Sequence, residues 1–355
     1  LILPPYFGVV GSWLPVLERL RSDCPSIQVI ALFARGQRII GQVDPNDMLA
    51  RLVDGLLDEV IFESWYGHLL CAPGLKEAAA LCRHRSLPRG LSVLIKQLQR
   101  SNLTKGLGRM IEQLAVRAAI RRHGNANRLR LEDLSEAVRA VCYDVSEGSD
   151  PVVREARLQF RNAYWFSLPH GIDIRTRVSR FSKVALKSPE HHNRTTAFLS
   201  SGEEVETYKA GFGLPETHIR VTGVPRHAPS WVARVRQAAD DMPTSRPYIF
   251  LVSRPANESF FPGSRKREAV QHVRRLAEHL GCDVVVRRHP KEYEEGVYEP
   301  LTKRPAKDSA WHISSLHPFA LGSKAMLAVT FFSSVAVDLI ATECPVIEHC
   351  NFLGL

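Results

Sequence analysis

The stretch from Met326 to Ile340 constrains the fold of this chain more than any other part of the sequence. Its first half, Met326 to Thr330, is a short apolar run rich in residues that favour β-strands, and its second half has apolar residues at helical spacing. Ser333 and Ser334 stand between the halves, which predicts a strand, a hydroxyl-bearing turn and a helix. The amino end of such a helix suits a phosphate or carboxylate, because its backbone N–H groups are free and its dipole end is positive. Taken alone, this stretch favours the plainer interpretation of an ordinary serine N-cap.

The alternation of strands and helices continues along most of the chain. It is typical of parallel sheets with helices on both faces, and it restarts after residue 247. The sequence therefore predicts an α/β fold of two tandem Rossmann-like domains that face each other across a cleft. The expected strands are 1–7, 27–33, 59–62, 162–168, 183–186, one within 213–226, 248–252, 283–287, 311–313 and 326–330, with a turn at 8–11 and helices at 12–22, 46–57, 131–141 and 265–280.

A Pro/Ser/Thr-rich run from Met242 to Pro247 marks the expected domain boundary. We expect a first domain at 1–226, a linker at 227–247 that contains a helical stretch, and a second domain at 248–355. The sequence starts at a residue other than Met and stops just after a predicted strand. Truncation, including the loss of a C-terminal helix, is therefore left open.

Composition excludes several classes of protein. Hydrophobic residues make up 45% and charged residues 24% of the chain, and no apolar run approaches the ~18 residues that span a bilayer. No export signal opens the sequence. The 7 cysteines are scattered without a CxxC pair, which argues for a reducing compartment and against a disulfide framework or zinc site. We therefore expect a cytoplasmic protein without bound metal.

The net charge of +10 predicts an anionic partner, and residues 89–130 concentrate that charge. This segment carries ten Lys and Arg residues and a single acid, Glu112, on two predicted amphipathic helices. Either the helices dock on anionic lipid or polymer, which would place the protein on the inner face of the plasma membrane, or they present a solvated basic face. The second interpretation is favoured. Nucleic acid is not an expected partner, because no nucleic-acid-binding pattern accompanies the charge.

Three chemically suggestive positions follow predicted strands: His170, His289 and the pair Ser333–Ser334. A lone histidine at a strand end is more often structural. In open parallel sheets, however, ligands bind beyond the carboxyl ends of the strands, so these positions share the place where a site is expected. A phosphate held by the second domain would have further cations within reach: Arg254, Arg288 and Lys291.

Four short motifs, in this order, resemble those of GT-B-fold transferases that use cytidine-nucleotide donors. These are the bacterial CDP-glycerol glycerophosphotransferases of teichoic acid synthesis and the capsule sialyl- and Kdo-transferases. The chain is similar to them over roughly 165–347, while residues 1–160 match only in architecture. The motifs are an HG motif at Leu168–Ile172, a segment similar to "tGyPR" at Ile219–Arg226, an HP motif at Val285–Lys291 and a Ser-Ser motif at Val329–Asp338.

The resemblance implies a cell-envelope transferase whose first domain holds the acceptor and whose second domain holds a CMP-, CDP- or UDP-linked donor, with no cofactor required. His170 would be the general base that deprotonates the acceptor hydroxyl, and His289 would contact the donor phosphate or protonate it as it leaves. Ser333 and Ser334 would bind that phosphate. Asp338 matches an acid of the family that either takes part or only supports the loop.

The chain also departs from these families. Phe331–Phe332 stand where the glycerophosphotransferases have Asp-Tyr before the serines, which leaves the donor base open. The sialyltransferases use a carboxylate base, for which Asp144 or Glu147 is the candidate here. They hold the ribose with an acid, and the region before the serines offers Ser315 and His317 instead.

Two other hypotheses stay open. Residues 8–15 resemble, in outline only, the opening of UDP-N-acetylglucosamine 2-epimerases, although the acids and histidines of those enzymes are not found here. The chain could also be a non-catalytic member of the fold that binds a nucleotide or a glycan.

Overall fold

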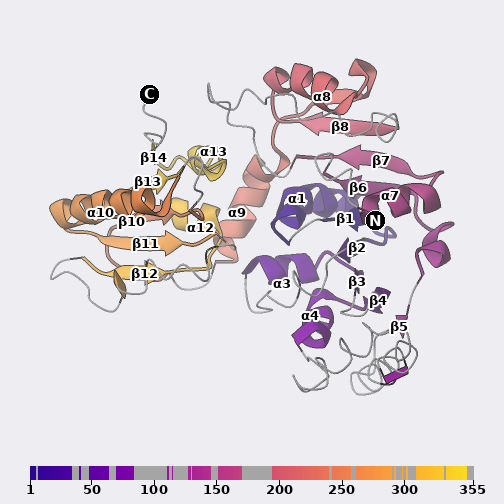
Figure 1. Cartoon of the computed structure of the whole chain (residues 1–355), viewed down its shortest axis with the longest axis horizontal. Coiled ribbons are helices and arrows are strands. Elements are labelled where there is room, and N and C mark those ends of the chain that lie inside the picture. Colours follow the sequence, from indigo (N-terminus) through magenta and orange to yellow (C-terminus); the bar gives the residue numbers. More distant parts are fainter. Residues whose placement is uncertain are drawn as a thin grey trace, which may run out of the picture. The chain divides into compact units, whose positions relative to one another are not determined.

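The computed structural model of this protein describes residues 1–4, 7–33, 40, 48–63, 69–83, 110–111, 114, 127–128, 130–144, 151–169, 194–239, 242–256, 261–289, 292, 298, 301–302, 309–331 and 333–349. They form two compact units, here called unit 1 and unit 2, and the chain passes from the first to the second between Pro225 and Arg226 (Figure 1). Each unit is a parallel-dominated sheet with helices packed on it. This confirms the predicted α/β fold class of two tandem Rossmann-like units.

In the described part of unit 1, nine strands form one sheet. All neighbouring strands are parallel except β4, which runs antiparallel to both of its neighbours. The strand order is β5 (Asn127–Arg128), β4 (Leu69–Ala72), β3 (Glu59–Glu63), β2 (Ile30–Phe33), β1 (Ile2–Leu3), β6 (Ala140–Tyr143), β7 (Tyr164–Ser167), β8 (Thr195–Leu199) and β9 (Ile219–Val221).

Helices cover both faces of this sheet. One face packs against the 3-10 turn η1 (Leu131–Leu134), α7 (Pro151–Gln159) and α8 (Val205–Phe212). The helices α1 (Phe7–Asp23), α3 (Met48–Asp54) and α4 (Leu75–Arg83) lie together on the other face (Figure 1). Short 3-10 turns η4 (Gly202–Glu204), η5 (Glu216–His218) and η6 (Pro225–His227) connect the last elements of this half.

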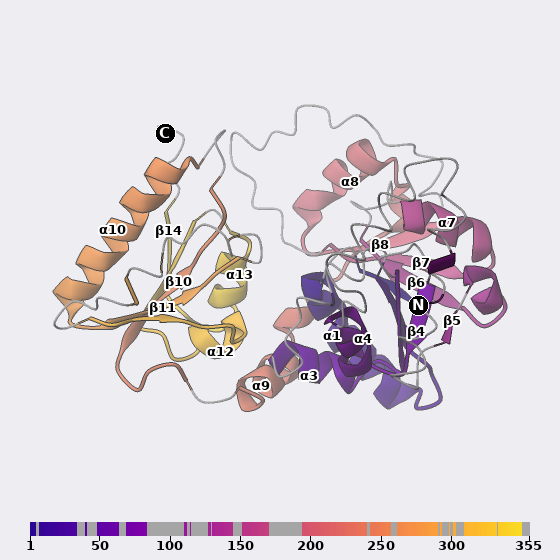
Figure 2. The same cartoon turned by 60° about the horizontal axis from the view of Figure 1, so that its bottom comes forward.

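Unit 2 contains a sheet of five parallel strands among its described residues, with three helices on its faces. Its order is β12 (Trp311–Ile313), β11 (Asp283–Arg287), β10 (Tyr248–Val252), β13 (Leu327–Thr330) and β14 (Val346–Glu348). Figure 2 shows α10 (Gly263–Leu280) on one face, and α12 (Pro318–Gly322) with α13 (Val335–Ile340) on the other. The remaining helix, α9 (Pro229–Gln237), packs against α12.

Burial explains why the strands of unit 2 are easy to recognise in the sequence. Every residue of β10 is buried, because the strand is central and helices cover both of its faces. A strand buried on both faces is a continuous apolar run rather than an alternating one. The strands predicted at 248–252, 283–287 and 311–313 are confirmed with the same bounds.

The turn predicted at Gly8–Gly11 is wrong, because these residues lie inside α1. Val10, Leu14 and Leu17 are all buried and fall at i, i+4 and i+7, so the apolar stripe of the helix starts within the glycine segment. The first strand is correspondingly shorter than predicted, ending at Leu3.

The helix predicted at 131–141 is also wrong. It is replaced by η1 and by the central strand β6, which pairs with β1 and β7. Val141 and Tyr143 are buried while Ala140 and Cys142 are less so, a period of two over only four residues. Such a short alternation is hidden by the Leu-, Glu- and Ala-containing run before it.

Several predictions concern residues outside the described ranges. The strand at 183–186 is one, and the basic segment 89–130 is another, apart from a few of its residues. Its docking on an anionic surface stays a prediction. Among the described helices, none combines the length and apolar character that crossing a bilayer requires.

Candidate functional site

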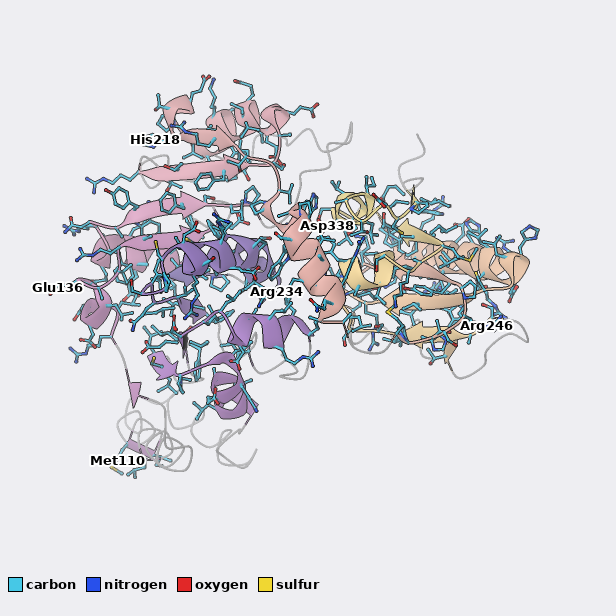
Figure 3. All side chains as sticks on the ribbon, turned by 180° about the vertical axis from the view of Figure 1, so that it is seen from behind. Met110, Glu136, His218, Arg234, Arg246 and Asp338 are labelled. Atoms are coloured by element: carbon cyan, nitrogen blue, oxygen red, sulfur yellow. The ribbon has the colours of Figure 1, made fainter. Side chains whose placement is uncertain are left out.

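The carboxyl ends of β11, β10 and β13 lie next to one another at one edge of the unit 2 sheet, because these parallel strands are direct neighbours. Arg254 follows β10, Arg288 and His289 follow β11, and Ser333 follows β13. The structure thus brings together at one edge the residues that the sequence had marked at separate strand ends. Figure 3 shows Asp338 near this end of the unit and Arg246, which precedes β10, at the opposite end.

Arg254 links two of these strand ends directly. Its Nη1 donates a hydrogen bond to the Phe331 carbonyl oxygen at 3.4 Å, just before the serine pair. Burial lowers the pKa of the Arg254 guanidinium, while the charges of Glu348 and Glu292 act in the opposite direction. An arginine keeps its proton under such shifts, so this half-buried group is a permanent cation beside the serine turn.

The serine turn itself departs from a simple N-cap. Ser334 is the N-cap residue of α13, but its side chain makes no capping hydrogen bond. Ser333 Oγ instead accepts from the Val335 N–H at 3.3 Å. Both serines are half-buried. The hydroxyl of Ser334 is therefore not used in capping the helix, and α13 itself is short, with 6 residues.

The His289 side chain is exposed, but its backbone is held by the buried residue Glu292. The His289 N–H donates to Glu292 Oε2, and the other carboxylate oxygen accepts from Ser253 Oγ at 2.5 Å and from Lys266 Nζ. Tyr298 Oη is hydrogen-bonded to Ser253 Oγ. These four supporting residues are all buried.

The sequence interpretation missed Lys266 and Glu292. A signal for the lysine was present, because Lys266 falls on the apolar stripe of α10 with Val270, Val273 and Ala277, and all four are buried. A lysine at such a position is buried only when it has a charged partner. Nothing in the sequence identifies Glu292 as that partner.

Asp338 lies in α13 and contacts Arg226 and His227, which belong to η6. Its Oδ1 accepts from Arg226 Nε at 2.8 Å and is paired with His227 Nε2 at 2.6 Å. Burial by itself would raise the pKa of the Asp338 carboxyl, but the hydrogen bond with His227 and the charge of Arg226 outweigh it and hold the pKa below its usual range. Asp338 thereby joins two of the four motifs, the segment ending at Arg226 and the Ser-Ser segment.

His317, predicted near the serines, is the N-cap of α12. Its Nδ1 accepts from the Phe319 N–H at 3.2 Å, which places the proton of a neutral ring on Nε2. Burial, with the nearby charge of Arg287, lowers the pKa of His317 to about 3. The ring is therefore a neutral hydrogen-bond donor near neutral pH. Ser315, the other residue named for this region, is exposed.

Four candidate residues remain. His170, Glu147 and Lys291 lie outside the described residues. Asp144 follows β6 in unit 1, and it is buried. Within the described ranges, no group of three or more His, Cys, Asp or Glu side chains is arranged to hold a metal ion.

Comparisons with known proteins identify a fold. No family model matches the sequence, and no curated protein matches it. A solved Listeria monocytogenes protein assigned as a UDP-N-acetylglucosamine 2-epimerase has a TM-score of 0.53 and 13% identity, over 97% of this chain and 77% of its own. The wall teichoic acid polymerase TagF has a TM-score of 0.51 and 11% identity, over 99% of this chain and 70% of its own. At such identities the likeness shows the fold alone, which is the GT-B type of two Rossmann-like units.

Proposed function

We propose that this protein is a GT-B transferase that moves a glycosyl or polyol-phosphate group from a nucleotide-activated donor, CMP- or CDP-linked, to a surface polysaccharide acceptor. The observation that carries the proposal is the position of Arg254, a permanent cation whose guanidinium reaches the backbone just before Ser333. A cation, a hydroxyl-bearing turn and an exposed histidine at adjacent strand ends are the groups that an anionic phosphate needs.

Each group has a role in this proposal. Arg254, Arg288 and Lys291 would bind the donor phosphates, and the hydroxyls of Ser333 and Ser334 would donate hydrogen bonds to them. His289 would contact the departing phosphate and protonate it. Asp338 would hold the serine helix through its ion pair with Arg226 rather than touch the donor.

The reaction needs one base and one leaving group. In glycosyl transfer, the acceptor oxygen attacks the anomeric carbon, the bond from that carbon to the phosphate oxygen breaks, and the electron pair leaves on the nucleotide phosphate. In polyol-phosphate transfer, the same oxygen attacks the phosphorus next to the polyol and CMP leaves. The acceptor proton passes to His170 in both cases, or to Asp144 or Glu147 if a carboxylate is the base.

A structural relative supports a cell-envelope role. The wall teichoic acid polymerase TagF has a similar fold over nearly the whole of this chain. The acceptor would then be a growing teichoic acid or capsule polymer, reached from the cytoplasmic face of the membrane. Of the two interpretations of segment 89–130, the less favoured one, in which its ten basic residues bind the anionic lipid surface, would supply the membrane contact. Co-sedimentation with anionic vesicles tests that last step, and salt-insensitive or absent binding would contradict it.

Thermal shift against CMP, CDP, UDP, GDP and ADP tests the donor site. A nucleotide at 100 times its Kd stabilises the folded state by about 2.7 kcal/mol, enough to raise the melting temperature measurably. We expect CMP or CDP to give the largest rise. The double variant Ser333→Ala/Ser334→Ala should lose it.

The matched control is Ser230→Ala/Ser264→Ala, which removes two exposed serines from α9 and α10 of the same unit. It should respond to the nucleotide as the wild type does. If none of the five nucleotides stabilises the wild type, the donor-binding proposal is wrong. If both double variants respond fully, the serine pair has no part in binding.

A second candidate is a UDP-N-acetylglucosamine 2-epimerase-like enzyme. The likeness to the Listeria monocytogenes protein favours it. A selective response to UDP, together with exchange of solvent hydrogen at the sugar C2 of UDP-N-acetylglucosamine, would support this candidate over the transferase. A non-catalytic role would be supported if nucleotide binds and His170→Ala leaves every measured property unchanged.

A further inference from the structure

A buried ion pair, Lys266 with Glu292, contacts the backbone of the exposed residue His289. Lys266 and Glu292 are each only 1% exposed, and Lys266 Nζ donates to Glu292 Oε1. Ser253 Oγ donates to the same oxygen, and Glu292 Oε2 accepts the N–H of His289. Lys266 Nζ also lies 5.5 Å from the centre of the Tyr298 ring. Both carboxylate oxygens are thus occupied by donors from three separate segments of unit 2.

Such a pair is not explained by stability alone. Removing two charges from water is costly, and apolar residues of similar volume often stabilise a core as well or better. What apolar residues cannot supply is a hydrogen bond to a particular backbone N–H. The network therefore fixes the position of the His289 backbone relative to β10 and α10.

We propose that Lys266 and Glu292 are positioning residues, which hold the His289 backbone so that the exposed His289 side chain faces an anionic phosphate. The phosphate part of this inference rests on the proposed function. Two consequences follow from the contacts. The His289 N–H is engaged by Glu292, so His289 acts on a phosphate through its ring. The charge of Lys266 neutralises Glu292, so the buried carboxylate does not repel that phosphate.

The test compares the removal of a buried ion pair with the removal of an exposed one. Lys266→Met/Glu292→Leu removes both buried charges and the carboxylate oxygen that accepts the His289 N–H, with residues of similar volume, so no unpaired charge remains in the core. The control, Arg265→Met/Glu268→Leu, removes an ion pair with a 3.0 Å contact whose side chains are 58% and 51% exposed. Ser253→Ala, which deletes one donor to Glu292 and keeps the charge pair, is a milder second variant.

Two properties of the full chain are measured for each variant: hydrogen exchange of the His289 amide and the Kd for CDP. We expect the buried double variant to exchange this amide about tenfold faster and to bind CDP about tenfold more weakly, the scale of one lost hydrogen bond to a charged group. The central amides of β11 should keep their protection. Ser253→Ala should shift both properties in the same direction by less, and the exposed control should shift neither.

The outcomes separate this inference from the proposed function. Unchanged exchange of the His289 amide in the folded double variant, or in Ser253→Ala if the double variant does not fold, overturns the positioning role. Faster exchange with wild-type CDP affinity retained overturns its connection to phosphate. Faster exchange in a protein whose wild type binds no nucleotide supports the positioning of the backbone and overturns the proposed donor site instead.

Discussion

Arg226 Nε lies 2.8 Å from Asp338 Oδ1, a contact that joins residues 112 positions apart in the chain. Both side chains are 11% exposed, so this ion pair is largely shielded from water. His227 Nε2 contacts the same oxygen. Arg226 and His227 together hold α13 against the segment that precedes α9. The helix α13, which follows the serine pair, is thus fixed by the carboxylate of its own residue Asp338.

Replacing Asp338 by Asn should destabilise unit 2. The substitution removes the negative charge that Asp338 places beside the shielded Arg226 guanidinium, a change that costs about 3 kcal/mol or more. The measurement is urea unfolding followed by tryptophan fluorescence, since Trp231 and Trp311 both lie in this unit. Glu278→Gln, which breaks a surface pair with Arg274, is the control and should cost less than about 1 kcal/mol. Equal losses in the two variants would contradict a structural role for the buried pair.

The stabilisation by Asp338 should depend on pH in one direction. Because the folded protein holds the pKa of this carboxyl below the ordinary value of 3.8, the ionised form stabilises the folded state. That contribution is complete above about pH 5 and is lost as the pH falls through the folded-state pKa. The stability difference between wild type and Asp338→Asn should therefore be constant near neutrality and shrink in acid. A difference that grows as the pH falls would show that the sign is wrong.

His317 should give a pH dependence at higher pH. Its pKa is lowered from 6.5 to about 3, so the folded state binds a proton less readily than the unfolded chain. Stability from this group is present above pH 6.5 and declines as the pH falls toward 3. His317→Asn keeps a side chain that can cap α12 and removes the titration. The wild type should lose stability relative to this variant between those two pH values, and parallel curves would contradict the prediction.

The sequence predicted unit 2 better than unit 1 for a physical reason. The strand β10 is buried throughout and β11 is buried from Asp283 to Val286, so each contains an apolar run that stands out from its surroundings. In unit 1, β6 has only 4 residues and follows a helix-like run, and β8 was not foreseen at all. The antiparallel strand β4 is likewise invisible to an argument from alternation of strands and helices.

Of the candidate site, the sequence could predict only which residues follow the ends of the strands. Parallel strands place residues such as Arg254 and Ser333 at one edge whatever their side chains do. Which groups touch is a matter of tertiary geometry. The pairing of Lys266 with Glu292, or of Arg226 with Asp338, depends on side-chain directions over long sequence separations. Short-range periodicity carries no information about such pairs.

Arg254 should make the largest single contribution to nucleotide affinity among the described cations of unit 2. Arg254→Met removes a charge-assisted hydrogen bond, and the Kd for CDP should rise by about 10-fold to 100-fold. The affinity should also become less sensitive to salt. Isothermal titration at two salt concentrations measures both effects, with Arg275→Met on the exposed side of α10 as control. Unchanged affinity in Arg254→Met would remove the main support for the donor site.

Gly322 tests how closely α12 must approach α13. A Cβ at this position would lie 2.4 Å from Leu339 Cδ2 and 3.1 Å from Thr342 Oγ1. Leu339 is fully buried and has little room to move, so Gly322→Ala should separate the helices and cost about 2 kcal/mol. In Gly211→Ala, a Cβ on α8 meets nothing within 4 Å, and the better helix propensity of alanine should stabilise by up to about 1 kcal/mol.

The two glycine variants therefore differ in the sign of their effect on urea midpoints. They should also differ in function, because α13 follows directly on Ser334 and moves with it. We expect Gly322→Ala to weaken CDP binding and Gly211→Ala to leave it unchanged. If Gly322→Ala is destabilised yet binds CDP as the wild type does, the serine turn is not held by the packing of α12 on α13, and Asp338 with Arg226 must position it without that contact.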